Sequence, residues 1–596
     1  MSEFSNEAMQ SYPFADITLP LSWSLVALEE ISADVSPGFA SGKHNSDGTG
    51  VPHLRPMNVD RDGQIDLKVI KSVAMSNGIE LRQGDVLFNN TNSAELVGKT
   101  AVVSAREGGF AFSNHMTRIR PEGGVNSVFV ARQLHFLWIA GYMKHRCTNH
   151  VNQASISSKT LAKTIPFHLP PAAEQTRIVA KLEELLTDLD AGVAELKAAQ
   201  KKLAQYRQSL LKAAVEGALT AEWRAKNTPA ETGAQLLERI LQERRVRWEA
   251  KQLAKSTEQG KTPPKDWRKK YPEPVQPDTT DLPELPAGWV WATLSQVGWL
   301  DRGRSKHRPR NAPHLYGGLY PFVQTGDIRH ADTFLSDVEA TYSEAGLAQS
   351  RLWPVGTMCI TIAANIGKTA ILSMEACFPD SVVGFLSGSD DVSIRYVEYF
   401  MRSVQQKLED EAPATAQKNI NLEILEKVVI PIPPTPEQHQ IVKLLDDSMG
   451  TARESDQAID LSLKQSTAQR QNILRAAFAG ELVLQDPNDE PASVLLERIQ
   501  AERAERAKQP KTRKTKPKEI ATMVSHLIDV LAEAGDWVPA QEAFRRCGVA
   551  DGALTDRIEE LYAELRKLDK EGRLAVEAVT DEQGRKLYDK LKLLAG

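Results

Sequence analysis

The sequence has few cysteines and no long apolar run. Four cysteines are scattered over 596 residues without any C-x-x-C pair, so the sequence supports neither a disulfide framework nor a cysteine zinc site. No stretch approaches the roughly 18 consecutive apolar residues of a transmembrane helix. The first residues lack the basic start and the apolar segment of a signal peptide. We therefore expect a cytoplasmic protein.

The sequence also lacks a phosphate-binding loop, although the tripeptide Gly-Lys-Thr occurs at Gly98 and again at Gly367. A phosphate loop needs a further glycine five positions earlier, so that successive backbone N–H groups wrap the phosphates. Those positions hold Ser93 and Ile362. The apolar residues after each Lys-Thr predict a strand, whereas a phosphate loop leads into a helix.

Other catalytic signatures are missing as well. No glycine-rich dinucleotide fingerprint, no Asn-Pro-Pro-aromatic methyltransferase signature and no His-Glu-x-x-His metal pattern is found. Pro379 and Asp380 match the start of one nuclease motif, but no convincing Glu-x-Lys follows them on a strand. We expect a chain without catalytic residues, bound metal or cofactor. A self-contained enzyme with motifs that escape this search is the alternative.

What the sequence does contain is an internal duplication at an offset of about 265 residues. LPLSWSLVALEEIS returns as LPAGWVWATLSQVG, which places Trp23 over Trp289. VGKTAVV returns as IGKTAIL, and YRQSLLKAAVEGALT returns as QRQNILRAAFAGELV in the same order. Several blocks in register exclude chance similarity, so the chain consists of two homologous units.

Each unit is predicted to be an α+β module followed by a long helix. Inside the modules, short β-branched runs alternate with Gly, Asn and Asp, which is typical of strands joined by turns. Each module ends at a Pro-Pro pair, with Glu174 or Glu437 in the expected first helical turn. Gly217 and Gly480 lie where the C-terminal caps of the two helices belong.

The two long helices carry apolar residues at coiled-coil spacing. The first has one line of leucines and a second, mixed line: Leu182, Leu189, Leu196, Leu203 and Leu210, then Ile178, Leu185, Ala199, Tyr206 and Ala213. The second helix has the corresponding Ile441, Leu445, Ala452, Ile459 and Ile473, interrupted by serines. Each helix could pack on its own module alone, but matching seams favour an antiparallel pair. A helix of about 40 residues is about 60 Å long, so such a pair would hold the modules apart.

Polar and cationic side chains cluster at matching places in the two modules. The net charge of -5 argues against indiscriminate coating of a polyanion, but it permits a local basic footprint. Arg grips guanine in bidentate fashion, and Asn or Gln grips adenine. The candidate DNA-binding residues are Lys43, His44, Asn45, Arg55, Asn58, Asn89, Asn90, Lys144, His145, Arg146, Arg302, Arg304, Lys306, His307, Arg308, Arg310, Gln324, Arg329, Gln417, Lys418 and Asn419. For each of them alone a solvated surface role is the favoured interpretation, and it is the set of clusters that indicates DNA binding.

The chain resembles the specificity subunit of type I restriction-modification systems. The resemblance extends over roughly residues 19 to 500 and rests on the paired order of its motifs. These motifs are LPxxW at Trp23 and Trp289, GKTA at Gly98 and Gly367, the PPxxEQ exits through Gln175 and Gln438, and (S/N)(L/I)LxAA at Ser209 and Asn472.

The resemblance implies a non-catalytic subunit in which each module is a target-recognition domain for one half of a split double-stranded DNA site. The paired helices would fix the spacer between the halves. Two modification subunits would carry S-adenosylmethionine and methylate adenine, and two restriction subunits would use ATP and Mg. Because the two frames agree while their polar loops differ, we expect an asymmetric bipartite target. A DNA-binding scaffold is a further alternative.

The resulting fold class is α+β, with two target-recognition modules, an antiparallel coiled coil and a winged-helix-like C-terminal extension; a small helical cap is the alternative for the extension. We divide the chain into an N-terminal tail (1–18), target-recognition domain 1 (19–170), coiled-coil spacer helix 1 (171–222), a helix and Pro-rich linker (223–282), target-recognition domain 2 (283–434), coiled-coil spacer helix 2 with a following helix (435–508), a basic linker (509–518) and the winged-helix-like domain (519–596).

Overall fold

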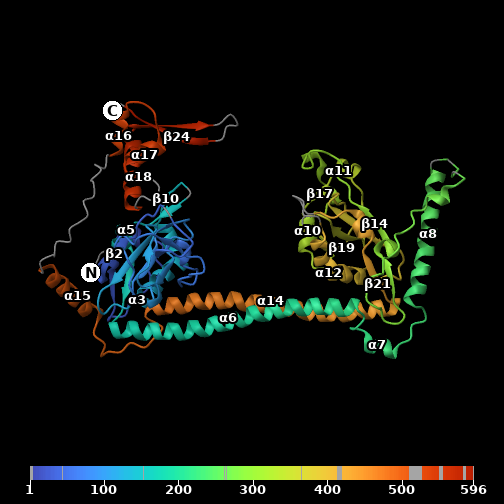
Figure 1. Cartoon of the computed structure of the whole chain (residues 1–596), viewed down its shortest axis with the longest axis horizontal. Helices are drawn as coiled ribbons and strands as arrows, with labels where there is room; N and C mark the ends of the chain where they lie inside the picture. Colours follow the sequence, from blue (N-terminus) through green and yellow to red (C-terminus); the bar gives the residue numbers. More distant parts are fainter. Residues whose placement is uncertain are drawn as a thin grey trace. The chain divides into compact units, whose positions relative to one another are not determined.

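The computed structural model describes residues 4–42, 44–151, 153–258, 260, 262–263, 265–363, 365–412, 419–508, 526–549, 555–580 and 586–594. They fall into two compact units, one formed by residues 1–194 with 463–596 and the other by residues 195–462. Two long helices, α6 (Ala172–Val215) and α14 (Thr435–Ala479), contribute residues to both units (Figure 1). No helix within the described ranges has the length and apolar character needed to cross a membrane.

The first module, in unit 1, is built on a four-stranded antiparallel sheet in the order β2-β9-β5-β7. Helix α3 contacts β5, β7 and β9, and a strand pair of β1 and β12 joins the beginning of the module to its end. The bounds of these elements are β1 (Ser24–Ala27), β2 (Ser32–Pro37), β5 (Val86–Asn89), β7 (Thr100–Val102), β9 (Met116–Pro121), α3 (Ser127–Ile139) and β12 (Pro166–Leu169).

Shorter elements complete this module and form its loops. Two further small sheets have the strand orders β4-β3-β8 and β10-β11-β6. The shorter elements are α1 (Asn6–Met9), α2 (Leu28–Ile31), β3 (Val51–Leu54), η1 (Pro56–Asn58), β4 (Lys71–Val73), β6 (Thr91–Asn92), η2 (Ala105–Glu107), β8 (Ala111–Phe112), α4 (Tyr142–Arg146), β10 (Thr148–His150), β11 (Gln153–Ser155) and α5 (Ser158–Thr164).

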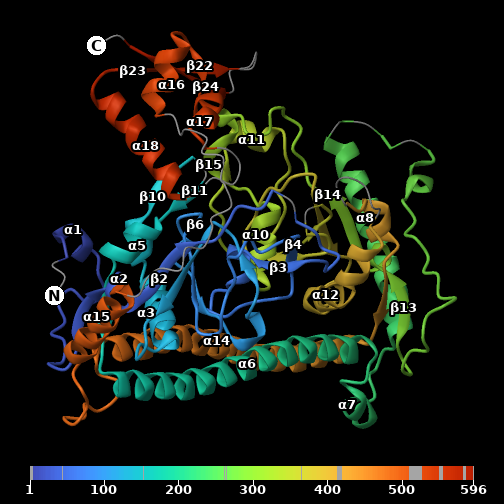
Figure 2. The same ribbon diagram turned by 60° about the vertical axis from the view of Figure 1, so that its left-hand side comes forward.

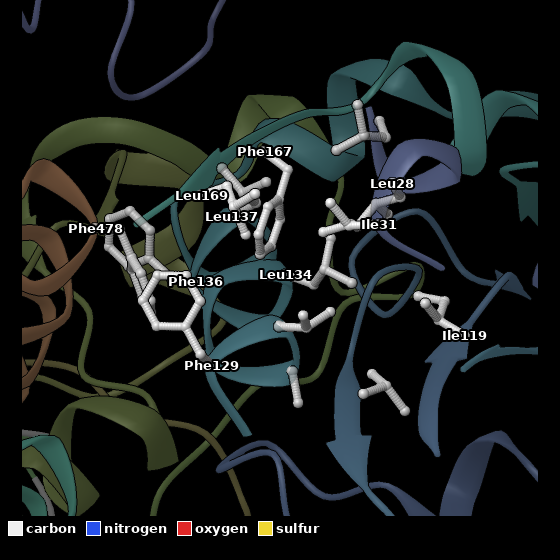
Figure 3. Packing of buried hydrophobic residues seen from close by; sticks show 14 of the residues in the cluster. Leu28, Ile31, Ile119, Phe129, Leu134, Phe136, Leu137, Phe167, Leu169 and Phe478 are labelled. Carbon is white, nitrogen blue, oxygen red and sulfur yellow. The ribbon is translucent and has the colours of Figure 1, made fainter. Parts of the chain in front are cut away.

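The core of unit 1 joins the module to the end of α14. Phe129 of α3 and Phe167 of β12 are fully buried and pack edge to face with their ring centroids 6.0 Å apart. Phe478 of α14 packs against Phe129 and Phe136 from the other side (Figure 3). The aromatic contacts therefore make the C-terminal end of α14 part of the first module's core.

The N-terminal segment is part of the same core. Tyr12 and Phe14 are buried, and the Tyr12 hydroxyl donates to the carbonyl of Pro166 over 3.2 Å. The division at Leu19, expected from the start of the repeat, therefore does not separate a free tail from the module. The residues before Leu19 lie outside the repeat, so comparing the two copies gives no signal for their contribution to packing.

The second module, in unit 2, repeats this topology. Its sheet has the order β14-β20-β18-β19-β16, of which the first four strands correspond to those of the first module. Helix α12 contacts β19, and β13 pairs with β21 as β1 pairs with β12. The bounds are β13 (Val290–Thr293), β14 (Gly298–Arg302), β16 (Phe334–Leu335), β18 (Met358–Thr361), β19 (Thr369–Leu372), β20 (Val382–Ser387), α12 (Ile394–Asp410) and β21 (Val429–Ile432).

Loops of the second module carry short elements of their own. A two-stranded sheet of β15 and β17 lies beside α11 and the turn η4. These elements are α9 (Leu294–Val297), η4 (Pro313–Leu315), β15 (Tyr316–Pro321), α10 (Thr325–His330), β17 (Thr341–Tyr342), α11 (Glu344–Ala348) and α13 (Leu422–Glu426). The two modules therefore share a sheet order and differ in the segments between strands, as the sequence predicted.

The long helices begin and end as predicted. Both start directly after the Pro-Pro pairs, and Gly217 and Gly480 adopt positive φ angles of 72° and 81° just past their ends. In unit 2 the segments of α6 and α14 run antiparallel, because Gln200 contacts Asp460 and Arg207 contacts Asp456. In unit 1 Arg470 of α14 pairs with Asp190 of α6.

Part of the predicted apolar pattern on α6 is not buried. Ile178 and Leu182 are buried, but Ala199 and Tyr206 are exposed, with Tyr206 48% exposed. Near the end of the helix, Leu211 is buried instead. The second predicted line of apolar residues is therefore not buried around Ala199 and Tyr206. Which face of α6 is buried depends on contacts with the modules as well as with the partner helix.

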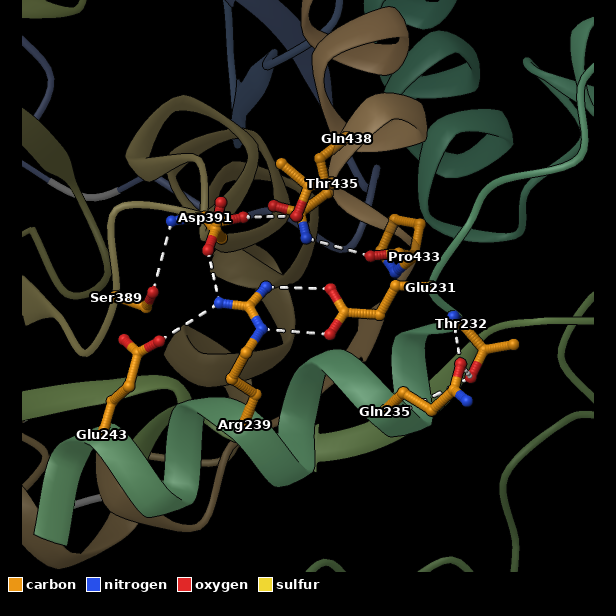
Figure 4. A network of polar contacts seen from close by, with 10 residues as sticks. All are labelled: Glu231, Thr232, Gln235, Arg239, Glu243, Ser389, Asp391, Pro433, Thr435 and Gln438. Atoms are coloured by element: carbon orange, nitrogen blue, oxygen red, sulfur yellow. Dashed lines mark hydrogen bonds and ion pairs between the residues drawn. The ribbon is translucent and has the colours of Figure 1, made fainter.

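A shorter helix follows each long helix and returns to a module. In unit 1 this is α15 (Ala492–Lys508), and in unit 2 α7 (Ala221–Lys226) precedes α8 (Gly233–Glu258). Arg239 of α8 forms ion pairs with Glu231 just before the helix and with Glu243 on it (Figure 4). It also pairs with Asp391, which belongs to the second module. On α15, Arg503 and Arg506 both pair with Glu122 of the first module.

The segment expected to be an extended Pro-rich linker is docked on unit 2. Its turn η3 (Trp267–Lys270) places Trp267 on Trp248, and Tyr271 is only 8% exposed. The backbone N–H of Val275 donates to Ser295 over 3.0 Å. Proline content predicted an extended chain, but three aromatic rings provide enough apolar surface to fix it.

The C-terminal segment contains the predicted helices and strand pair. Helices α16 (Leu527–Ala534), α17 (Ala540–Arg546) and α18 (Thr555–Lys570) accompany β22 (Val538–Pro539), β23 (Leu574–Thr580) and β24 (Lys586–Leu593). The strands form a sheet in the order β22-β24-β23, against which α16 and α17 pack (Figure 2). The basic linker 509–518 lies outside the described residues.

Candidate nucleic-acid interface

A cleft of about 260 Å³ in the second module brings together three of the predicted DNA-binding residues. Arg302 ends β14, Arg310 belongs to the loop after it, and Asn419 comes from a segment more than 100 residues later. Asp380, Ser381 and Asn421 complete the polar lining. The antiparallel pairing of β14 with β20 brings the end of one strand beside the beginning of the other.

Asp380 orients both arginines. Arg302 donates from Nε and Nη2 to the Asp380 backbone carbonyl, at 3.1 and 2.7 Å. Arg310 donates from Nη2 to both carboxylate oxygens, at 2.8 and 2.9 Å. The Arg310 and Asp380 side chains are 49% and 39% exposed, so their ion pair is worth little in water and is readily exchanged. Both guanidinium groups are thus held at the surface with N–H groups free for phosphates or base edges.

The other cations of the basic loop are exposed, but they differ in whether they bond within the loop. Arg304 and Lys306 project at the surface. Arg308 donates to the carbonyls of Ser305 and His307, which holds the loop in its present course. Sequence reasoning had found the loop but not Asp380 as its anchor, because Pro379-Asp380 was considered only as a fragment of a nuclease motif.

Two other predicted residues of the second module lie apart from this cleft. Gln324 is exposed and is the N-cap residue of α10. Arg329, at the end of the same helix, lines a separate cleft with Arg207 of α6 and Lys368. Asn421, which the sequence search passed over, caps α13 by accepting from the Ile424 N–H at 2.9 Å.

Three predicted asparagines of the first module are buried and have structural roles. Asn58 donates to the carbonyls of Asp66 and Val69, and Asn89 donates to the carbonyl of Pro56. Asn90 donates to the Asn114 carbonyl and the Thr117 hydroxyl. These amide groups therefore hold the module's own backbone in place. The sequence shows an amide but not the carbonyl that it satisfies.

The first module has histidines near the place where the second has its basic loop. His44 is exposed, and its ring lies 3.2 Å from the ring nitrogen of buried His53. Burial, aided by His44 and Arg55, lowers the pKa of His53 to about 4. Burial also lowers the pKa of His44, with smaller contributions from Arg55 and Lys71. Both rings are neutral at pH 7, so this surface is less cationic than the loop after β14. Asn45 donates to Thr49 within its own turn.

The predicted cluster at residues 144–146 is largely paired. Lys144 forms an ion pair with Glu95 over 3.3 Å, and Arg146 donates to the Glu7 carbonyl over 2.7 Å. His145 is exposed. Lys43, Gln417 and Lys418 lie outside the described residues.

The Gly-Lys-Thr turn of the first module has a structural role. Lys99 is 6% exposed and its Nζ donates to the carbonyls of Val59 and Pro56. The turn leads into β7, as the sequence predicted, and the Lys99 ammonium is engaged by backbone carbonyls inside the module. Among the described residues, no group of three or more His, Cys, Asp or Glu side chains is arranged to hold a metal ion.

The duplicated α+β frame, with an arginine-lined cleft in its second module, defines a protein of two related modules. The family model for the type I restriction modification DNA specificity domain matches the chain twice, over residues 41–198 and 286–459. The chain therefore belongs to this family of type I restriction enzyme specificity subunits.

Individual relatives agree with this assignment. The Escherichia coli EcoDI specificity subunit is 26% identical over 356 residues, which cover 57% of this chain and 69% of that protein. The Escherichia coli EcoBI specificity subunit is 24% identical over 379 residues, covering 60% and 68%. A chain solved in a structural study of the assembly of a type I restriction-modification system matches with a TM-score of 0.57 at 20% identity, over 78% of this chain and all of the other. This last match shows a shared fold.

Proposed function

We propose that this chain selects the DNA target of a type I restriction-modification complex, with each module reading one half of an asymmetric, bipartite site. The observation that supports this most is the contrast between equivalent surfaces. In the second module the loop after β14 presents Arg302 and Arg310, whereas in the first module the neutral His44 and His53 lie near the corresponding place. Similar frames with different hydrogen-bonding groups suit two unlike half-sites.

The long helices would pair as an antiparallel coiled coil that sets the spacer between the half-sites. The contacts of Gln200 with Asp460 and of Arg207 with Asp456 support the pairing, and so does the pair of Asp190 with Arg470. The division into target-recognition domains 19–170 and 283–434 and spacer helices 171–222 and 435–508 is part of this proposal.

The reactions would be carried out by partner subunits. Two modification subunits would bind S-adenosylmethionine and methylate adenine, and two restriction subunits would use ATP and Mg. The C-terminal segment would be a winged-helix-like domain, a proposal that the helix and strand order and the sheet β22-β24-β23 support. The arginine-lined cleft supports DNA readout by this chain, to which we assign no cofactor.

The test is the methylation pattern made by the complex of this chain with its modification partner. Mapping methylated adenines on random DNA should give one interrupted sequence with two unlike halves. Arg310→Ala should relax or alter only one half, because the cleft lies wholly in the second module. Lys427→Ala, an exposed cation of the same module outside the cleft, is the matched control. A continuous site, a change in both halves, or DNA cleavage by the isolated chain would contradict the proposal.

A further inference from the structure

A second cleft, of about 300 Å³, lies between α8 and the edge strand β14 in unit 2. Its walls carry three indoles and three cations: Trp248, Trp299, Trp353, Arg247, Lys251 and Arg351. This volume is at the lower end of the range for small-molecule sites. The residues come from the last turns of α8, from β14 and from the segment before β18.

The indoles are held in place from behind. Trp248 stacks on Trp267 with centroids 5.8 Å apart and an interplanar angle of 23°. The Arg244 guanidinium lies 3.8 Å from the centroid of Trp299. Trp353 is buried between Phe378 and the guanidinium of Arg351. Trp353 therefore supports the wall, and the partly buried Trp248 and Trp299 are the rings that can stack on a ligand. Because they are held in place, they do so with little further loss of conformational freedom.

The cleft carries an excess of positive charge. Asp301 is the one carboxylate among its lining residues, and it pairs with Arg351 over 2.5 Å. Arg247 forms a long ion pair of 3.8 Å with Glu243, and no ion pair of Lys251 is found within the part of the chain that the structure describes. Lys251 is therefore available to an anion, and the exposed, loosely paired Arg247 can turn to the same anion.

The first unit has different residues at the positions equivalent to this cleft. Arg503 on α15 occupies the position of Arg244 on α8, and it donates to Glu122 and to the carbonyls of Glu29 and Ser32. Arg244 is 5% exposed, and its Nε and Nη1 find no hydrogen-bond partner among the described residues. In the repeat, Ala33 stands where the second unit has Trp299. The shared frame thus does not require the aromatic and cationic lining.

We infer that this cleft binds one unpaired nucleobase together with its phosphate. The base stacks on the exposed indole surface, where every base offers a π face. The phosphate meets Lys251 and Arg247 on α8. An uncharged aliphatic ligand would neither pair with the cations nor stack on the indoles. An inorganic anion would pair with the cations but could not stack on the indoles.

The ligand could be a free mononucleotide or one nucleotide of an unpaired DNA strand. Trp299 and Asp301 lie on β14, directly before Arg302 of the DNA-interface cleft. The two sites are therefore adjacent along one strand, which favours DNA as the source. The site goes beyond duplex readout, since reading base edges in a groove requires no unpaired base.

The test uses the purified full-length chain, with adenosine 5′-monophosphate and a short single-stranded oligonucleotide as separate probes. Saturation-transfer NMR and tryptophan fluorescence should both report saturable binding. Trp248→Ala and Lys251→Glu should each weaken binding of at least one probe by roughly tenfold or more. Lys255→Glu, on the same helix but outside the cleft, is the matched control and should change nothing. Binding of the mononucleotide alone identifies a free ligand, and binding of the oligonucleotide alone identifies a strand.

Three results would overturn the inference: neither probe binds, inorganic phosphate competes as well as the mononucleotide, or Lys251→Glu behaves like Lys255→Glu. Because Lys251 is exposed, its substitution leaves the fold intact. Binding of target duplex should be unchanged in Lys251→Glu and weakened in Arg310→Ala. Failure of the nucleotide site is thereby distinguished from failure of the proposed DNA specificity.

Discussion

The indole N–H of Trp23 donates to Oε2 of Glu174 over 3.0 Å, and this bond connects the first motif of the module to the first turn of α6. The second unit makes the same bond between Trp289 and Glu437 over 2.9 Å. The LPxxW and PPxxEQ motifs are thus two halves of one contact. Each pair also fixes how a module sits on the helix that leaves it.

Replacing Trp23 by Phe should destabilise unit 1 by about 1 to 3 kcal/mol. Glu174 is 1% exposed, and without the indole its carboxylate keeps Gln485 as its one side-chain donor among the described residues. The loss would be measured as the free energy of unfolding by chemical denaturation. Trp291→Phe, which removes a long bond of 3.3 Å to the Pro283 carbonyl, is the control and should cost less than about 0.5 kcal/mol. Equal effects of the two substitutions would show that the buried bond contributes nothing.

Much of the frame could be predicted because its signals are local. A Pro-Pro pair starts a helix and a glycine ends it, whatever the rest of the chain does. Both α6 and α14 follow these signals. The strand after Gly-Lys-Thr and the helices of the C-terminal segment were likewise visible in short stretches of sequence.

The candidate site depends on contacts that no local pattern encodes. Arg302 and Asp380 meet because β14 pairs with β20, and Asn419 joins them through an isolated bridge to Ala363. Neither segment alone encodes its pairing with a distant partner. Asn90, between β5 and β6, was predicted to contact DNA but is buried, since an asparagine amide can donate to a backbone carbonyl as well as to a base. The docking of Tyr271 was missed for the same reason: its partner Trp248 lies on another element.

Replacing Phe478 by Ala should cost unit 1 about 3 to 5 kcal/mol. The ring is fully buried between Phe129 and Phe136, so its loss leaves a cavity where α14 meets the module. Thermal unfolding of the full chain would measure it. Val215 occupies the equivalent position on α6 and is only partly buried, so Val215→Ala should have a smaller effect. A Phe478→Ala protein as stable as wild type would contradict the assignment of α14 to this core.

Replacing Lys99 by Ala should destabilise the first module by about 1 to 3 kcal/mol without affecting nucleotide binding. Its ammonium satisfies two buried carbonyls, those of Val59 and Pro56. Lys368, the matching residue of the second module, is half-buried and makes no Nζ hydrogen bond with the described residues. Lys368→Ala is therefore the control with the smaller loss. A phosphate-loop role would give the reverse pattern, loss of nucleotide binding with little change in unfolding.

Unit 1 should lose stability in mild acid because three of its histidines are buried in the neutral form. Burial is the main cause that lowers the pKa of His53, His135 and His168 to about 4. His135 accepts from the Thr100 N–H, which requires a neutral ring nitrogen. In the unfolded chain the histidine pKa is about 6.5. Between these values the unfolded state binds protons that the folded state does not, so stability falls as the pH falls from about 6.5 to about 4.

Each of these histidines should contribute a slope of about 1.4 kcal/mol per pH unit in that window, and none above or below it. Replacing His168 by Asn isolates one of them, because an amide N–H can still donate to the Phe478 carbonyl that the imidazole now reaches at 2.8 Å. The variant should therefore show a shallower loss of unfolding free energy on acidification, measured by chemical denaturation across the window. His330→Asn, at an exposed position in unit 2, is the control and should keep the wild-type slope. Parallel pH profiles for wild type and His168→Asn would mean that this ring carries no proton-linked stability, and that acid acts on unit 1 through its carboxylates instead.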